Sequence, residues 1–143
     1  MGNIAVGGQD QILVLKLDSV DNKLSGLLVS RPYLPTSKFT VCWIPDVDRS
    51  RLAMTSEDNV TILDIDWTCD EGFVRKLGSF ILEEDNIMGS SISEKVIFAI
   101  TGQGRLYIED IPDIMEDEMA FINQIQVKIQ CMCIGIGRGK ESF

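Results

Sequence analysis

The chain of 143 residues is 45% hydrophobic and 24% charged, and its thirteen basic and twenty-two acidic residues give a net charge of −9. This length and composition fit one globular unit with a buried core. Because the negative charge repels phosphate backbones and anionic membrane surfaces, we expect the partners to be other proteins, with no nucleic acid and no membrane.

Short segments of alternating apolar and polar residues follow one another along the chain, separated by Gly, Pro, Asp and Asn. Segments of this kind, with a turn signal every eight to twelve residues or so, predict an all-β sandwich, barrel or propeller. Pro45 ends the fourth segment, because proline cannot donate a hydrogen bond within a central ladder. The predicted strands cover residues 3–8, 11–18, 24–30, 39–46, 51–58, 59–66, 73–80, 88–93, 95–101, 104–111, 121–129 and 131–137.

One pattern recurs three times, at residues 4–17, 52–65 and 98–111. Each copy has a strand with alanine in second place, a small polar turn and an alternating strand. The copies follow one another after 48 and then 46 residues. A nearly constant period close to the roughly 40–45 residues of a propeller blade favours a propeller over a sandwich.

The second copy resembles the WD-repeat β-propeller family. The stretch "LAMTSEDNVTILDI" is similar to the family's inner hairpin, and "VCWIPDVDRSRLA" is similar to the strand before it. Aspartate keeps the family's acidic position at Asp64 and Asp110. Other residues stand where the family has its terminal Trp, namely Leu15, Leu63 and Glu109, and the Gly-His pair is absent. The resemblance implies a divergent fold of antiparallel propeller blades.

We expect about three blades rather than a closed ring, because propellers close with roughly four to eight blades. The predicted division is an incomplete blade at 1–31, blades at 37–82 and 86–128, and the start of a further blade or a tail at 129–143. Such an arc leaves unpaired edges and open faces. We therefore expect a segment of a larger propeller, or one that is completed by oligomerisation or by a partner.

The residue types available for chemistry favour a binding function over catalysis. Histidine is absent, which removes the usual general base and zinc ligand, and the four cysteines lack zinc-knuckle spacing. We expect the cysteines, Cys42, Cys69, Cys131 and Cys133, to be small apolar residues of a reduced interior. We predict no catalytic residue, no metal and no cofactor.

The expected function is a non-enzymatic scaffold for protein–protein interaction within a larger intracellular protein or complex. The start of the sequence lacks the features of a secretory signal, so we expect a cytoplasmic or nuclear location. The alternative is a carboxylate-based hydrolase or a ligand-binding propeller, because paired carboxylates can cleave glycosides without histidine.

The stretch "SEDNVTILDID", residues 56–66, admits three interpretations. A calcium loop that starts at Asp46 and ends at Glu57 would place Arg51 where an EF-hand has its turn-making glycine. A glycosylation sequon at Asn59 would lie in a tight turn. We favour the third interpretation, a hairpin whose acidic residues form the turn.

The connection "SRPYLPTSK", residues 30–38, is the first candidate partner-binding segment. Arg31 and Tyr33 are residue types that carry much of the binding energy in interfaces, and two prolines stiffen the loop. The family resemblance implies that such connections lie on a partner-binding face. An ordinary loop is the alternative.

The acidic connection "EDIPDIMEDEMAFINQ", residues 109–124, is the second candidate, with Asp113 and Glu116 as its binding residues. In one interpretation Asp113 caps a short helix that places Met115, Met119 and Ile122 on one side and docks a basic or amphipathic partner. In the other, the segment is a solvated connection between strands.

Overall fold

The computed structural model describes residues 2–7, 11–30, 33–35, 38–46, 49–67 and 72–126. The regular structure of these residues consists of strands, which confirms the predicted all-β class. The same residues contain no helix that is long and apolar enough to cross a membrane. The strands are β1 (Gly2–Gly7), β2 (Ile12–Asp18), β3 (Lys23–Val29), β4 (Thr40–Ile44), β5 (Ser50–Thr55), β6 (Asn59–Asp66), β7 (Phe73–Ile81), β8 (Ile87–Ile92), β9 (Val96–Thr101), β10 (Arg105–Asp110), β11 (Glu118–Ala120) and β12 (Gln124–Gln126).

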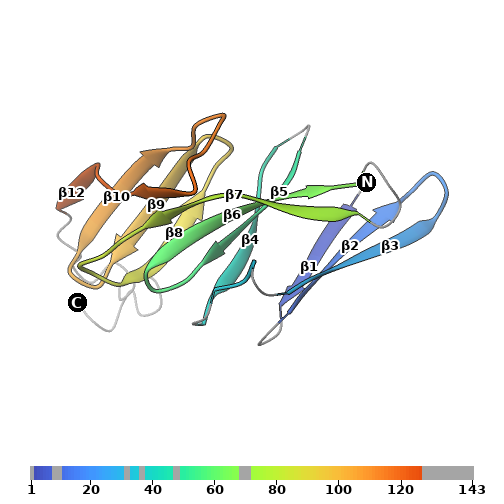
Figure 1. The fold of residues 1–143 in the computed structure, drawn as a ribbon, viewed down its shortest axis with the longest axis horizontal. Coiled ribbons are helices and arrows are strands. Elements are labelled where there is room, and N and C mark those ends of the chain that lie inside the picture. Colours follow the sequence, from blue (N-terminus) through green and yellow to red (C-terminus); the bar gives the residue numbers. More distant parts are fainter. Residues whose placement is uncertain are drawn as a thin grey trace, which may run out of the picture.

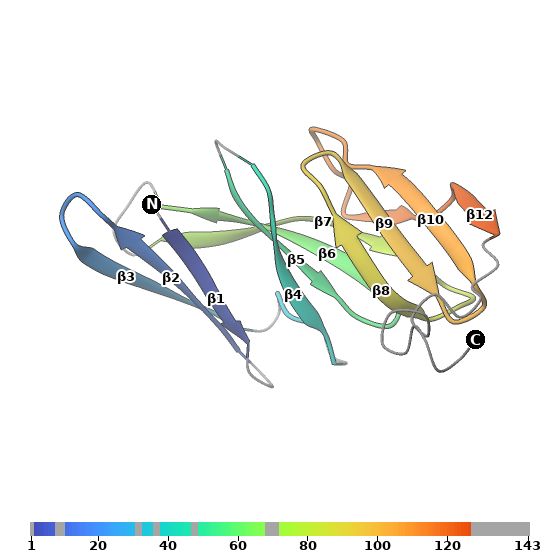
Figure 2. The same cartoon turned by 180° about the vertical axis from the view of Figure 1, so that it is seen from behind.

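These strands form three sheets that follow one another along the chain. The N-terminal sheet has the order β1-β2-β3, the central sheet β11-β7-β6-β5-β4, and the C-terminal sheet β12-β10-β9-β8. Neighbouring strands are antiparallel, except that β11 pairs with β7 in parallel. The central sheet lies between the other two in both views of the molecule (Figures 1 and 2). The division into blades at 1–31, 37–82, 86–128 and 129–143 stays a prediction.

The three copies of the repeated pattern are antiparallel hairpins, one in each sheet. The alanine of each copy pairs across the hairpin, Ala5 with Val14, Ala53 with Ile62 and Ala99 with Tyr107. The third hairpin therefore has one residue fewer between the alanine and its partner. As a result Glu109, and not Asp110 as the sequence comparison placed it, takes the register position of Asp64.

The middle strands of the central sheet, β5 and β6, are buried on both faces. Leu52, Met54, Leu63 and Ile65 pack in one cluster with apolar residues of the N-terminal sheet. Residues that alternate with them along the same strands pack in a second cluster with the C-terminal sheet: Ala53, Val60 and Ile62. As a result β5 and β6 are buried almost without interruption, including the polar residues Arg51, Thr55 and Thr61.

The acidic turn between β5 and β6 confirms the hairpin interpretation of residues 56–66. The Ser56 amide donates to the Asn59 carbonyl at 2.9 Å. The carbonyl groups of Glu57 and Asp58 accept hydrogen bonds from the amides of Ile87 and Leu82, at 2.7 and 2.8 Å. The turn thus fixes the connection that leads from the central sheet to the C-terminal sheet.

Arg51, which stands where an EF-hand loop has its glycine, forms an ion pair. The Arg51 side chain is buried, and its Nη2 donates to Asp46 Oδ2 at 2.8 Å. A guanidinium group therefore occupies the carboxylate that would be the first ligand of the loop. Asp48 lies outside the described residues.

The expectation that the cysteines are interior residues is wrong for Cys42. It lies on β4, an edge strand of the central sheet, with its side chain exposed. An edge strand leaves part of its surface uncovered, so an apolar residue type there need not be buried. Cys69, Cys131 and Cys133 lie outside the described residues, as does the strand predicted at 131–137.

Candidate functional site

The connection between β10 and β12 crosses from the C-terminal sheet to the outer edge of the central sheet and back. We call residues 111–123 the crossing segment. Within it, β11 adds to β7, with Glu118 opposite Ser79 and Ala120 opposite Ile81. The helix considered for residues 113–122 is not formed, because the main chain instead bonds to β7: the Ser79 amide donates to the Asp117 carbonyl at 2.9 Å.

A buried carboxylate holds the end of the crossing segment. Glu109 is 5% exposed, and its Oε1 accepts the amide N–H groups of Ile122 and Asn123 at 2.5 and 2.7 Å. Its Oε2 accepts the Asn123 side-chain amide at 3.0 Å. Glu109 takes the same register position in the C-terminal hairpin as Asp64 takes in the central one. In the C-terminal hairpin, the acidic residue at this position therefore anchors the crossing segment.

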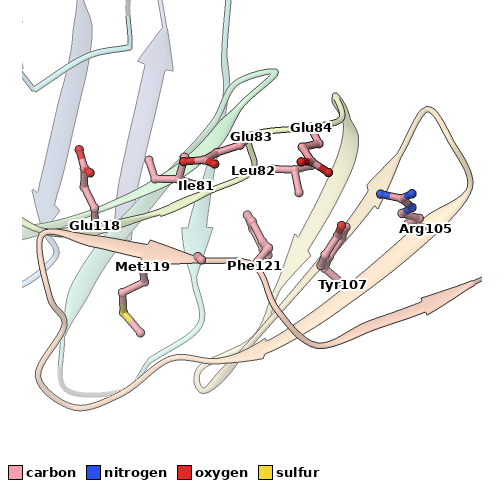
Figure 3. Close-up of a pocket in the computed structure, with 10 residues that line it drawn as sticks. Ile81, Leu82, Glu83, Glu84, Arg105, Tyr107, Glu118, Met119 and Phe121 are labelled. Carbon is pink, nitrogen blue, oxygen red and sulfur yellow. The ribbon is translucent and has the colours of Figure 1, made fainter.

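A pocket of about 410 Å³ opens where the crossing segment passes between the two sheets (Figure 3). The Phe121 side chain is buried beside it, with its ring centroid 5.5 Å from that of Phe80 and 5.6 Å from that of Tyr107. The lining has six apolar or aromatic residues and four charged ones: Ile81, Leu82, Tyr107, Met119, Ala120 and Phe121, with Glu83, Glu84, Arg105 and Glu118.

Tyr107 brings a polar group into this apolar part of the pocket. The residue is 6% exposed, and its hydroxyl has no hydrogen-bond partner among the described residues. Figure 3 shows the hydroxyl directed toward the segment that carries Leu82 and Glu84. The hydroxyl is not one of the fully buried polar atoms that lack a partner, so it is reached from the pocket and is available to a ligand.

The charges around the pocket are mostly negative. Glu83, Glu84 and Glu118 are exposed at its rim, and Arg105 is the basic residue of the lining. Hydrogen bonding to the Thr101 side chain, then to the Asn86 amide, and the nearby positive charge of Arg105 lower the pKa of Asp85 below its ordinary value. Asp85 is therefore ionised at neutral pH and offsets the charge of Arg105.

The structure places the sequence-predicted binding residues on two separate connections. Tyr33 is exposed, next to a buried Leu34, in the connection between the N-terminal and central sheets, while Arg31 lies outside the described residues. Asp113 and Glu116 are exposed in the crossing segment, before β11. No interaction joins Tyr33 to either acid in the part of the chain that the structure describes.

Sequence reasoning missed the pocket itself, including Tyr107, Phe121, Arg105 and the rim glutamates. The sequence shows the acidic residues Glu83 and Glu84 just after β7. Their proximity to Glu118, however, depends on the parallel pairing of β11 with β7. The inward direction of Tyr107 follows from the register of β9 and β10. A shorter turn in the third hairpin was the only signal for that register.

No family model, curated protein or solved structure matches the chain.

Proposed function

We propose that the chain is a protein–protein interaction module, built as a divergent WD-repeat-like run of blades, whose outer sheet faces pack against further β-sheets. These sheets would belong to a larger assembly or to a second copy. Three successive hairpin-based sheets with a central sheet covered on both sides support this proposal, because blades of a propeller pack face to face in this manner.

The observation that carries the proposal is the apolar outer face of the N-terminal sheet. Ile12 and Val14 of β2 are buried toward the central sheet, so the residues that alternate with them face outward. Leu13 pairs with Leu28, and Leu17 pairs with Leu24. These four leucines are all exposed, which leaves a contiguous apolar surface of the kind that marks interaction sites.

The C-terminal sheet has a similar outer face. Phe98 is exposed between the buried Ile97 and Ala99, and Ile125 is exposed opposite Leu106. The central sheet shows what such faces look like when another sheet covers them, because Leu52, Ile62 and Leu63 of its middle strands are fully buried. The partner chemistry that fits the outer faces is therefore the apolar face of another sheet.

The test replaces two face leucines by lysine, Leu24→Lys with Leu28→Lys, and compares the variant with Val20→Lys. Val20 is an exposed apolar residue in the β2–β3 turn, outside the face, so it controls for the added charge. We expect light scattering and affinity purification to show association of the unmodified chain and of Val20→Lys. The double variant should lose it, because two ammonium groups would be buried without partners.

Equal association of the double variant and the unmodified chain would contradict the proposal, as would a monomer that retains no protein partner. Hydrolysis of a glycoside by the purified chain, lost on replacing Glu83 and Glu84 with Gln, would favour the carboxylate-based alternative instead.

A further inference from the structure

We propose that the pocket between β10 and the crossing segment binds a lysine or arginine side chain of a partner protein. This inference rests on the proposed interaction function and names the chemistry of one contact. It is carried by the shape of the pocket, the free Tyr107 hydroxyl and the carboxylates at the rim.

The apolar part of the pocket fits the stem of such a side chain. Leu82, Met119 and Phe121 provide aliphatic and aromatic surface, and the cavity of about 410 Å³ has room for an extended side chain. Lysine and arginine place their methylene groups on apolar surface and keep the charged head in a polar environment. A small anion or a fully apolar side chain would satisfy only one of these two regions.

The head group is recognised by three kinds of group. The Tyr107 hydroxyl offers an acceptor at the pocket surface, with no hydrogen bond to another of the described residues. The faces of aromatic rings attract cations, and Tyr107 and Phe121 lie at the pocket with their centroids 5.6 Å apart. Glu83 and Glu84 then complete the contact as carboxylate acceptors at the rim.

The charge balance favours a cation over a carboxylate ligand. Arg105 would attract an anion, but the ionised Asp85 lies near enough for the two groups to interact electrostatically. Glu118 adds a third negative charge at the rim, and Asp113, Glu116 and Asp117 lie exposed just before it in the crossing segment. The field at the pocket is therefore negative, in line with the net charge of −9.

The experiment titrates the full chain with Nα-acetyl-lysine N-methylamide and follows the methionine methyl groups by NMR. Met119 lines the pocket and is the reporter, while the fully buried Met54 lies in the other core cluster and is the internal control. We expect a saturable shift of the Met119 signal with a dissociation constant of about 1 mM, typical of a small probe. The norleucine analogue, which has the stem without the charge, should bind about tenfold more weakly.

Two variants test the assignment of the head group. Replacing Glu83 and Glu84 together with Gln should weaken lysine binding about tenfold, because it removes two negative charges. Tyr107→Phe should weaken it about threefold, because it removes the hydroxyl acceptor. Both changes leave the pocket shape in place. Glu94→Gln, a matched change at an exposed position in the β8–β9 turn, should have no effect. Unchanged unfolding midpoints would show that the variants remain folded.

Three results would overturn the inference. Equal binding of the lysine and norleucine probes would make the pocket a purely apolar site. If Glu94→Gln weakened lysine binding as much as the change of Glu83 and Glu84, the effect would come from the net charge of the chain and not from the pocket. A shift of Met119 by the glutamate analogue, lost in Arg105→Gln, would assign the pocket to an anion. None of these changes touches the outer faces, so this result and the test of sheet packing stand independently.

Discussion

Glu109 is a buried carboxylate whose acceptor capacity is taken up by the crossing segment. Glu109→Ala would leave the amides of Ile122 and Asn123 without their acceptor, and we expect it to lower the free energy of unfolding by about 3 kcal/mol. Glu109→Gln keeps a carbonyl oxygen of similar position, so its cost should be less than half as large. Urea denaturation measures both changes.

A loss of stability that is the same for alanine and glutamine at position 109 would show that the negative charge, and not the acceptor, holds the segment. The residue also shows a limit of sequence analysis. An alignment of the repeats without gaps matched Asp110 with Asp64, whereas the register of β9 and β10 places Glu109 at that position. A one-residue change in a turn moves every later side chain to the other face.

The crossing segment depends on a glycine in the strand that it covers. A Cβ added at Gly78 would collide with the Glu116 carbonyl oxygen and would lie 3.1 Å from Met115 side-chain atoms. We therefore expect Gly78→Ala to displace the segment from β7 and to cost about 1–3 kcal/mol. Hydrogen exchange at the amides of β11 and of Ser79 should accelerate relative to the unmodified chain.

Gly26→Ala is the matched control for this change, because it also replaces a strand glycine. A Cβ at Gly26 would meet Leu15 at 3.4 Å and Leu13 at 3.8 Å, which are ordinary contacts. It should leave the exchange of β11 unchanged and should slightly stabilise the chain, since alanine loses less backbone freedom than glycine on folding. Exchange in β11 that responds equally to both variants would contradict the role given to Gly78.

The sequence predicted the hairpins but not the crossing segment, for a physical reason. In the hairpins, alternation and turn residues act locally, so Val60, Ile62 and Ile65 are buried as their pattern predicts. The helical spacing of Met115 and Met119 also suggested local structure, but main-chain hydrogen bonds to a strand about forty residues earlier prevailed. The pocket inherits this limit, because it forms only where that long-range pairing brings Phe121 to Tyr107.

At the scale of the whole molecule, the three sheets form a stack, and among the described residues each core cluster joins two neighbouring sheets. The N-terminal and central sheets share one apolar cluster, and the central and C-terminal sheets share the other. In such an arrangement stability is approximately a sum of contributions from each sheet and each interface. Damage to one interface should therefore loosen the sheet beyond it more than the sheet on the opposite side.

Ile62 and Leu63 test this property because they are consecutive, fully buried residues of β6 that belong to different clusters. Each change to alanine removes a similar volume and should cost about 2–5 kcal/mol. We expect Leu63→Ala to accelerate native-state hydrogen exchange in β2, and Ile62→Ala to accelerate it in β9. The two variants serve as controls for each other. If the two variants accelerated exchange equally in β2 and β9, the stack would unfold as one cooperative unit. The two outer sheets would then not be stabilised separately by their own interfaces with the central sheet.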